Sequence, residues 1–523
     1  MNKTRPRHAA NPLTRHLPER RYLPELHGVR GLALAGVVLF HLFGNGRVSG
    51  GIDIFLAVSG FLFTGMLLRE AAASGGRIDP LKYYGRLVRR ILVPAVIVVA
   101  ATLLIGLLVS PVTKHSQLWA EARASLLYFE NFELINSQLA YGAAGPETSP
   151  FQHFWSLSVQ GQFYIIWPVL AIVAVLIAKR IQKSAAGVMT VLIGIVFVAS
   201  FAYAVYVSSY NQDEAYLMTT TRAWQLAFGG LLALAGGTIR LPQGIRTPAG
   251  WIGLAMIATT GFLLDGAQLF PGPWALYPLV GLTLVLISAG PQGGHHDPKH
   301  TASRFLSNRA LAWIGDHAYG LYLWHWPLLI YYMEFRDREA IGWRGALVIL
   351  AVTVILAMLT YRYIEQPLKQ RQTQRGASRA QRANKILVTV AAGSLVVVGT
   401  GATLVLNQPA HQVNLAENWN WHTHPGAMTT AKGYSAAPKD VDYLPQPAQL
   451  PAERAELYDR EERCIQRAGN NPDTSEVLVC DDPQNPDSPS ATIVISGGSH
   501  SVHWHAAFKE LASQYNWELL VVN

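Results

Sequence analysis

Arg30 and His41 are the two ionisable side chains in the apolar stretch 28–44. They lie eleven residues apart, which is about 16 Å along an α-helix. Because eleven residues are close to three turns, both side chains project from one face. A hydrocarbon core is roughly 30 Å thick, so one or both groups must lie inside it. Such residues usually face a cavity, although Arg30 could extend to the inner surface and His41 could be an ordinary core histidine.

Asp53 and a cluster of three arginines are the next candidates along the chain. Asp53 lies at the start of a second apolar stretch, where an acid could simply favour the beginning of a helix. Arg86, Arg89 and Arg90 lie at the border of a third apolar stretch. Such a cluster is commonly a cytoplasmic anchor, but it could also bind the phosphates of a cytoplasmic cofactor.

Polar side chains also enter the later apolar stretches. Gln160 follows Trp155 in the amphipathic segment 153–164, and His325 follows Tyr322 in a segment rich in tryptophan. Near the end of this region, Arg362 and Glu365 are spaced i,i+3 and could simply pair with each other.

The composition predicts a protein that crosses a membrane many times. Half of the 523 residues are hydrophobic and only 14% are charged, with a mean hydropathy of +0.20. The net charge of +9 is divided unevenly, because residues 407–523 contain 7 Lys/Arg and 15 Asp/Glu, which leaves the remainder at +17. A basic membrane part and an acidic tail indicate opposite sides of a bilayer.

We expect an all-α polytopic membrane protein with about ten core transmembrane helices and one further tether helix. The basic amino-terminal arm is predicted to be cytoplasmic, and an odd number of spans then places the tail outside. Cys464 and Cys480 both lie in this tail, where a disulfide is plausible. The predicted spans are 28–44, 51–68, 91–109, 161–178, 186–207, 222–237, 249–264, 274–290, 313–333, 343–363 and 386–406.

The chain divides into six predicted parts. The C-terminal part contains a strand at 491–496, a helix at 502–515 and the start of a second strand at 517–522, which indicates a fragment of an α/β domain. The parts are a cytoplasmic arm 1–26, a membrane domain 27–368, a linker 369–385, a tether helix 386–406, an extracytoplasmic linker 407–490 and the fragment 491–523.

Taken in order, these motifs resemble the acyltransferase-3 family over residues 22–370. The resemblance rests on Arg30 with His41, on Asp-Ile-Phe before Ser-Gly-Phe, on Trp-Ser-Leu-Ser-Val, on Leu-Tyr-Leu-Trp-His-Trp-Pro and on Tyr-Arg-x-Ile-Glu-x-Pro. The C-terminal part resembles the start of an SGNH-type extracytoplasmic domain. Two positions depart from the family patterns, since Gln160 stands where glutamate is common and Gly498 replaces the aspartate of a Gly-Asp-Ser block.

The resemblance implies transfer of an acyl group, usually acetyl, from cytoplasmic acyl-CoA to a hydroxyl of an extracytoplasmic glycan or glycolipid. His41 would be the general base, since histidine titrates near neutral pH. Arg30 would bind the pyrophosphate or the thioester end, and Asp53 would orient His41 or the acceptor. Phosphate contacts would come from Arg86, Arg89 and Arg90, and substrate contacts from Tyr322, His325, Trp155 and Gln160.

Ser499 is the nucleophile that the SGNH resemblance implies, although a serine there could also be an ordinary N-cap. A strand, two glycines and a helix would expose its hydroxyl on a tight turn. SGNH enzymes take their base from a later Asp-x-x-His motif, and the sequence stops at Asn523 before one. We therefore expect an incomplete domain in a truncated chain, without serine-dependent esterase activity.

Other classes of function stay open at this point. A transporter or flippase of an envelope glycolipid, or a structural scaffold of the envelope, could also hold polar residues within its spans. Candidate acceptors are peptidoglycan, lipopolysaccharide-type polysaccharide, a succinoglycan-like polymer and, favoured by the sequence variants, a mycolate-bearing trehalose glycolipid. We expect no metal, no nucleic acid and no permanently bound cofactor.

Overall fold

The computed structural model divides the chain into two units, residues 1–110 with 117–403 and residues 111–116 with 404–523. The predicted tether helix 386–406 and almost all of the arm 1–26 and the linker 369–385 lie outside the described residues. The described residues are 23–44, 47–137, 148–235, 241–289, 294–370, 420, 422–430, 444, 456–458, 464 and 477–522.

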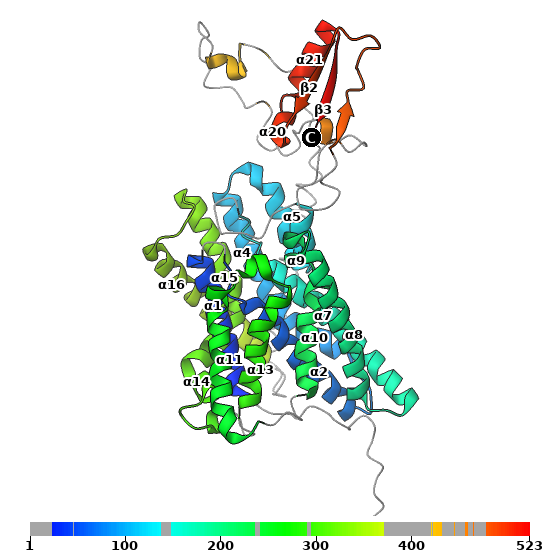
Figure 1. Cartoon of the computed structure of the whole chain (residues 1–523). Helices are drawn as coiled ribbons and strands as arrows, with labels where there is room; N and C mark the ends of the chain where they lie inside the picture. Colours follow the sequence, from blue (N-terminus) through cyan, green and yellow to red (C-terminus); the bar gives the residue numbers. More distant parts are fainter. Residues whose placement is uncertain are drawn as a thin grey trace, which may run out of the picture. The chain divides into compact units, whose positions relative to one another are not determined.

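The first unit is built from helices, and ten of the eleven predicted spans correspond to helices in its described part (Figure 1). Six helical segments are long and apolar enough to cross a membrane, so the chain is a multi-pass membrane protein. These are Pro24–Phe43, Gly51–Ala73, Pro80–Val109, Phe154–Ile181, Ala185–Ser208 and Trp343–Leu368. The other four predicted spans fall on α10, α11, α13 and α15.

In chain order the helices of this unit are α1 (Pro24–Phe43), α2 (Gly51–Ala73), α3 (Pro80–Leu87), η2 (Val88–Leu92), α4 (Val93–Val109), α5 (His115–Leu126), α6 (Glu130–Asn136), α7 (Phe154–Ile181), α8 (Ala185–Ser208), α9 (Gln212–Leu217), α10 (Thr219–Ala235), α11 (Gln243–Leu263), α12 (Gly266–Leu269), α13 (Leu276–Ser288), α14 (Ala302–Leu306), α15 (Arg309–Arg336), α16 (Trp343–Thr360), η6 (Tyr361–Glu365) and α17 (Gln366–Gln370). Short 3-10 turns lie at Pro273–Ala275 and Gly294–His296, and a further one at Val112–Lys114 belongs to the second unit.

Helices α1 and α15 pack closely because glycines let their backbones touch. A Cβ atom at Gly31 would meet the carbonyl oxygen of Leu311, and one at Gly315 would overlap the carbonyl oxygen of His27. Small residues at helix interfaces are the usual way for membrane helices to approach each other. This contact sets α1, which carries Arg30 and His41, against α15, which carries His325.

Helices α2 and α10 make a second contact of the same kind. A Cβ atom at Gly60 would overlap the carbonyl oxygen of Leu226, and one at Gly229 would overlap that of Ala57. Because neither position has room for a side chain, the two helices hold a fixed register. The contact sets Asp53, at the start of α2, against the start of α10.

The short helices α5 and α6 bury two glutamates. Glu121 on α5 is 1% exposed and Glu130 on α6 is fully buried. Glu121 accepts hydrogen bonds from the Gln117 amide at 2.8 Å and from the Ser149 hydroxyl. Burial raises the pKa of Glu121 to about 8.

The described part of the second unit contains a three-stranded sheet and short helices (Figure 1). Strands β2 (Ala491–Ser496) and β3 (Trp517–Val522) pair in parallel, with Ala491 opposite Trp517, and β1 (Val479–Asp481) pairs with the other edge of β3 in antiparallel fashion. Helices α20 (Ser499–Val502) and α21 (His505–Tyr515) connect β2 to β3. The predicted strand, helix and strand are confirmed. Two 3-10 turns, η7 and η9, lie at Gly426–Thr430 and Glu456–Tyr458.

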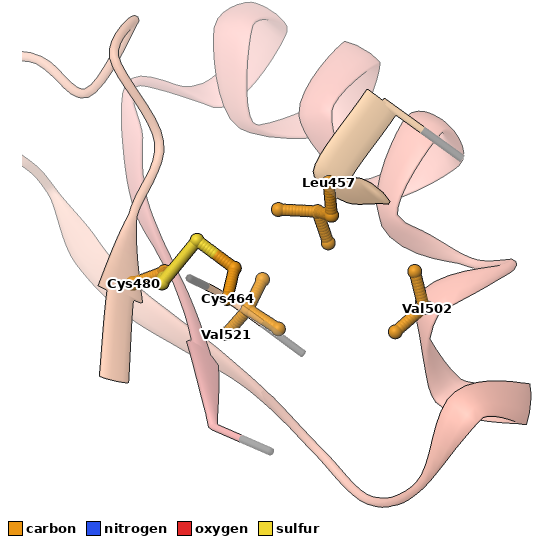
Figure 2. Packing of buried hydrophobic residues seen from close by; sticks show 5 residues of the cluster. All are labelled: Leu457, Cys464, Cys480, Val502 and Val521. Carbon is orange, nitrogen blue, oxygen red and sulfur yellow. A yellow bond between two sulfur atoms is a disulfide. The ribbon is translucent and has the colours of Figure 1, made fainter. Parts of the chain in front are cut away.

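A disulfide joins Cys464 to Cys480 in the second unit. Leu457, Val502 and Val521 are buried around it, so the disulfide belongs to a small hydrophobic core (Figure 2). The pairing that the sequence made plausible is therefore present in the structure.

Gly60→Ala should destabilise the membrane domain by about 1–3 kcal/mol, since the added methyl group would overlap the backbone of α10. The midpoint of thermal unfolding of the detergent-solubilised protein is the measurement. Gly194→Ala on α8 is the matched control, because a Cβ atom there has no neighbour within 4 Å. That substitution should be neutral or stabilising by up to about 1 kcal/mol. Equal effects of the two substitutions would contradict the close packing of α2 and α10.

The raised pKa of Glu121 predicts a stability that falls with increasing pH. The folded state holds the proton up to about pH 8, whereas the unfolded chain releases it near the ordinary glutamate pKa of 4.5. The unfolding free energy should therefore decrease across this window by a few kcal/mol, at about 1.4 kcal/mol per pKa unit. Thermal unfolding measured from pH 5 to pH 8 should show a flatter profile for Glu121→Gln, but not for the exposed control Glu339→Gln.

Candidate functional site

A cavity of about 760 Å³ in the membrane domain is lined by five arginines. Four of them, Arg30, Arg86, Arg89 and Arg90, are the residues that the sequence predicts for phosphate binding, and the fifth is Arg69 on α2. Two carboxylates, those of Asp316 and Glu365, also line the cavity, so its lining carries an excess of positive charge.

The arginines approach the cavity from α1, α2, α3 and η2. Arg30 lies on α1 and Arg69 near the end of α2. Arg86 lies in the last turn of α3 and pairs with the carboxylate of Glu70 at 2.9 Å. Arg89 donates to the carbonyl of Gly85 at 2.8 Å, within its own segment. The sequence predicts all of these helix ends at the cytoplasmic face, which is why residues far apart in the chain can meet there.

Two π-helical segments form part of the same wall. Segment η2 contributes Arg89, Arg90 and Ile91 to the cavity, and η6 contributes Tyr361 and Glu365. A π-turn adds one residue to a helical turn and is frequent at functional sites. It rotates the side chains that follow it, so these two segments help to direct the charged groups toward the cavity.

The inner end of the cavity reaches polar residues of α7 and α15. Gln160, Tyr164 and Tyr322 line it, as does Ser156, whose hydroxyl is 2.7 Å from that of Tyr322. The Tyr322 hydroxyl also donates to the carbonyl of His153 at 2.8 Å. Two of the predicted substrate residues, Gln160 and Tyr322, therefore share one cavity with the arginines.

His41 and His325 lie beside this end of the cavity and contact each other directly. The Nδ1 atom of His41 is 2.9 Å from the Nε2 atom of His325, and the two ring planes differ by only 8°. The indole of Trp326 packs edge-on against His41, with ring centroids 4.6 Å apart, and donates to the carbonyl of Ser149 at 2.9 Å. The sequence places His325 with the substrate, whereas the structure makes it the partner of the predicted base.

His153 is the third histidine of this cluster. It is 1% exposed, and its ring centroid lies 5.9 Å from that of His325 and 5.4 Å from that of Tyr322. The segment that contains it was recognised from the sequence, but no role was assigned to the residue.

A second, much smaller cavity of about 10 Å³ is lined by His41, Ser49, Asp53 and Tyr216. That volume is about the minimum for a single water molecule. Ile52 lines both this cavity and the larger one. His41 therefore lines the small cavity and contacts His325, which follows the cavity-lining residue Tyr322 by three positions.

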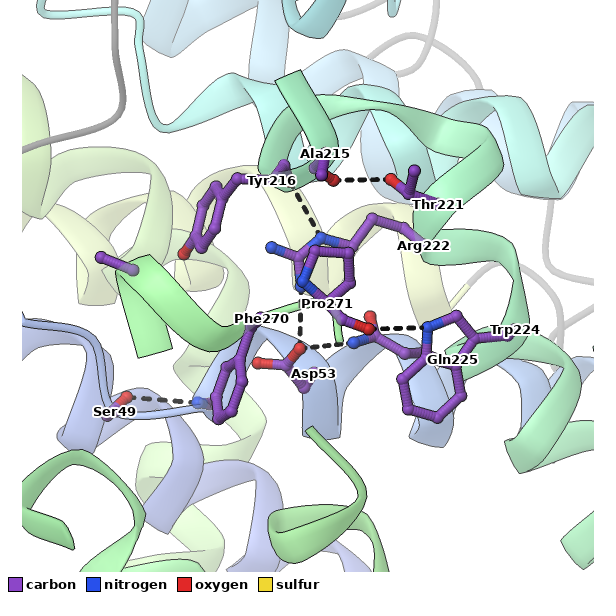
Figure 3. Close-up of polar contacts among 12 residues, drawn as sticks. Ser49, Asp53, Ala215, Tyr216, Thr221, Arg222, Trp224, Gln225, Phe270 and Pro271 are labelled. Carbon is purple, nitrogen blue, oxygen red and sulfur yellow. Dashed lines mark hydrogen bonds and ion pairs between the residues drawn. The ribbon is translucent and has the colours of Figure 1, made fainter. Parts of the chain in front are cut away.

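Asp53 forms a buried ion pair with Arg222 (Figure 3). The carboxylate is 2.8 Å from the guanidinium and also accepts from the amide of Gln225 at 2.5 Å. Arg222 is fully buried and donates to the carbonyl of Tyr216 at 2.9 Å. The sequence predicts that Asp53 orients His41 or the acceptor, and this stays a prediction; the described contacts add an ion pair that joins α2 to α10.

Trp155 is placed against Arg222 and does not line the arginine cavity described above. Its ring lies 5.1 Å from the guanidinium carbon of Arg222, and the ring of Tyr216 lies on the same guanidinium at 4.4 Å. Cation–π contacts of this kind stabilise a desolvated guanidinium. The role of Trp155 at the substrate stays a prediction, and the contact shown in the structure is with the buried ion pair.

The remaining predicted residue, Ser499, lies at the start of α20, and its side chain lies outside the described part of the structure. Among the described residues, no group of three or more histidine, cysteine, aspartate or glutamate side chains could hold a metal ion. The sequence missed Arg69 and Arg222. The signal for Arg222 was available, since it is a lone arginine at the start of the apolar stretch 222–237.

Comparison with known proteins adds relatives of named function. The O-acetyltransferase OatA of Staphylococcus aureus is 26% identical over 364 residues, which are 67% of this chain and 58% of that protein. The peptidoglycan O-acetyltransferase OatA of Listeria monocytogenes is 28% identical over 364 residues, with 67% and 56% covered. The match thus spans little more than half of the length of these relatives. No solved structure matches the chain.

The family is shown by a match that covers most of the chain. Residues 23–362 match the acyltransferase-3 model, described as an acyltransferase domain. This range contains the small cavity, the five cavity arginines, the histidine pair and all but two of the residues that line the large cavity, Glu365 and Leu368. We conclude that the chain belongs to the acyltransferase-3 family and that its membrane unit is an acyltransferase domain.

Proposed function

We propose that this protein transfers an acetyl group from cytoplasmic acetyl-CoA to a hydroxyl of peptidoglycan outside the membrane. The observation that carries the proposal is the arginine cavity, which extends from helix ends predicted to be cytoplasmic to Tyr322, three residues before His325. A donor bound there would have its charged end among the arginines and its reactive end near His41.

The donor suits the chemistry of the cavity. Coenzyme A carries a pyrophosphate and a 3′-phosphate on one end, and arginines bind phosphates through paired N–H donors. Arg89 and Arg90 follow each other on η2, and Arg30 lies deeper on α1. Apolar side chains such as Phe55, Leu62 and Phe63 line the same cavity and would contact the uncharged pantetheine arm.

His41 would act as general base on the acceptor hydroxyl. It would take the proton as the hydroxyl oxygen attacks the thioester carbonyl. The carbon–sulfur bond would then break, and the proton on His41 would pass to the sulfur, so that coenzyme A leaves as the thiol. The small cavity at His41, Ser49 and Asp53 has the size of one hydroxyl group. It lies across Ile52 from the donor cavity.

The acceptor is proposed from the relatives. The names of the Staphylococcus and Listeria proteins describe an O-acetyltransferase and a peptidoglycan O-acetyltransferase. The Bacillus subtilis protein YrhL, 28% identical over 67% of this chain and 55% of its own length, is named for the same peptidoglycan activity. These names favour peptidoglycan over the mycolate-bearing trehalose glycolipid that the sequence variants suggested.

The orientation follows from charge. The arginine-lined helix ends would face the cytoplasm by the positive-inside rule, and the acidic second unit with its disulfide would lie outside. We also assign this unit to the SGNH type, on its parallel β2–β3 pair joined by helices and on the serine at the start of α20.

His41→Ala should abolish acetyl transfer, and His41→Gln should not restore it, because glutamine cannot accept a proton. The measurement is transfer of radiolabelled acetyl from acetyl-CoA to peptidoglycan fragments by protein in proteoliposomes. Residual turnover close to that of the wild type in His41→Ala would show that His41 is not the base. Arg30→Lys should also be impaired, since lysine keeps the charge and loses the planar fork.

Arg89→Ala and Arg90→Ala should each raise the KM for acetyl-CoA by about 10–100-fold. Each substitution removes one charge-assisted hydrogen bond to a phosphate, and such a bond contributes about 1.5–3 kcal/mol. Arg344→Ala is the control, since Arg344 lies over the ring of Trp343 and not among the cavity-lining residues. The same assay at varied acetyl-CoA concentration gives KM and kcat separately. A KM unchanged in both cavity variants would exclude phosphate binding at η2.

A further inference from the structure

We propose that His325 is a positioning residue that fixes the tautomer of His41, so that the Nε2 atom of His41 carries the basic lone pair. The inference rests on the proposed role of His41 as general base and adds the group that prepares it. Nothing in the motif pattern distinguishes this role from substrate contact. It follows from the direction of the hydrogen bonds around the two rings.

The backbone of α15 determines which nitrogen of His325 carries hydrogen. The Nδ1 atom lies 2.7 Å from the carbonyl oxygen of Tyr322 and 3.2 Å from that of Leu321. A carbonyl oxygen can only accept, so Nδ1 of His325 must be the protonated nitrogen. In the neutral ring the Nε2 atom of His325 is then an acceptor.

The acceptor nitrogen of His325 determines which nitrogen of His41 carries hydrogen. Its Nδ1 atom lies 2.9 Å from the acceptor Nε2 of His325, so His41 donates its Nδ1 hydrogen there. The lone pair of His41 is therefore on Nε2, at the opposite side of the ring from His325. Both rings satisfy this contact without carrying a charge, which suits the cost of burying one.

The arrangement performs the task of the carboxylate in a serine-protease triad. There an aspartate accepts from Nδ1 of the catalytic histidine and holds the reactive tautomer. Here the Nε2 lone pair of His325 accepts, and the Tyr322 carbonyl orients His325 in turn. When His41 takes the proton of the acceptor hydroxyl, its Nδ1 hydrogen stays bonded to His325, which stabilises the imidazolium.

Packing holds the pair in this geometry. His325 is 2% exposed, its ring plane lies within 8° of that of His41, and Trp326 packs edge-on against His41 at 66°. A tilt of either ring would lengthen the nitrogen–nitrogen contact. The pair thus depends on the close packing of α1 on α15.

The test compares His325→Phe with His325→Gln. Phenylalanine keeps the ring and removes the acceptor, so kcat should fall on the order of 10²–10⁴-fold, as for loss of a tautomer-fixing group, with little change in the KM for acetyl-CoA. Glutamine offers an amide oxygen to His41 and an amide N–H to the carbonyl, and should keep at least about tenfold more activity than phenylalanine. Its pH profile should retain the wild-type shape, whereas that of His325→Phe should not.

His317→Phe is the matched control on the same helix. His317 also bonds a backbone carbonyl four residues earlier, that of Trp313 at 2.8 Å, and stacks on aromatic rings, but His41 is not its described partner. This variant should keep most of the wild-type rate. Equal kcat losses in His317→Phe and His325→Phe, or equal losses in His325→Phe and His325→Gln, would overturn the proposal.

A second readout does not need activity. In protein labelled with ¹⁵N-histidine, the His41 signals are those lost in His41→Gln, and they should show a protonated Nδ1 and an unprotonated Nε2. His325→Phe should abolish this single tautomer, and His317→Phe should not. A protonated Nε2 in the wild type would overturn the inference even if acetyl transfer is observed. The correct tautomer in an inactive protein would leave the inference standing while the proposed function fails.

Discussion

Direct backbone contact between crossing helices is the constraint on which the site depends. Glycine on α15 allows the helix to lie against the backbone of α1 at His27, and the same arrangement recurs between α2 and α10. In a membrane, where lipid competes for apolar surface, such close approach is a principal source of helix association. The first contact brings His41 to His325, and the second brings Asp53 to Arg222.

The cost of polar groups in a membrane explains how the charges are distributed. The cavity arginines lie at helix ends and along a large open volume, where water or a phosphate-bearing ligand can solvate them. Arg222 is fully buried instead, and it has a carboxylate, a carbonyl and two aromatic faces as partners. His325 is buried and His41 is partly buried, and the tautomers that we propose let the two rings form their hydrogen bond without a charge.

The sequence predicted the composition of the cavity better than the contacts within it. Arg30, Arg86, Arg89 and Arg90 could be assigned to one site because the positive-inside rule places their helix ends on one face. The partnership of His41 with His325 spans 284 positions in the sequence and depends on the crossing of two helices. No local sequence pattern predicts which residue of α15 contacts His41. The π-helical segments were also not predicted from the sequence.

The same limit applies to Asp53 and Trp155. Asp53 was noted in the sequence as an acid at the start of a membrane helix, but the sequence does not show its ion-pair partner, which lies 169 positions away on α10. Trp155 was predicted to contact the substrate, and the sequence does not show that its ring packs on the Arg222 guanidinium. A motif identifies residues that matter together, and only the fold distinguishes those that meet a ligand from those that support them.

Ile52 lies between the two cavities on a helix whose position is fixed by packing and by an ion pair. It lines both cavities, and the next residue, Asp53, is held to α10 by the ion pair with Arg222. The glycines of α2 and α10 fix the register of the same two helices. The ion pair and the glycine contacts therefore both constrain the backbone of α2 at Ile52. The position of Ile52 between the two cavities therefore depends on the same contacts that hold Asp53 to Arg222.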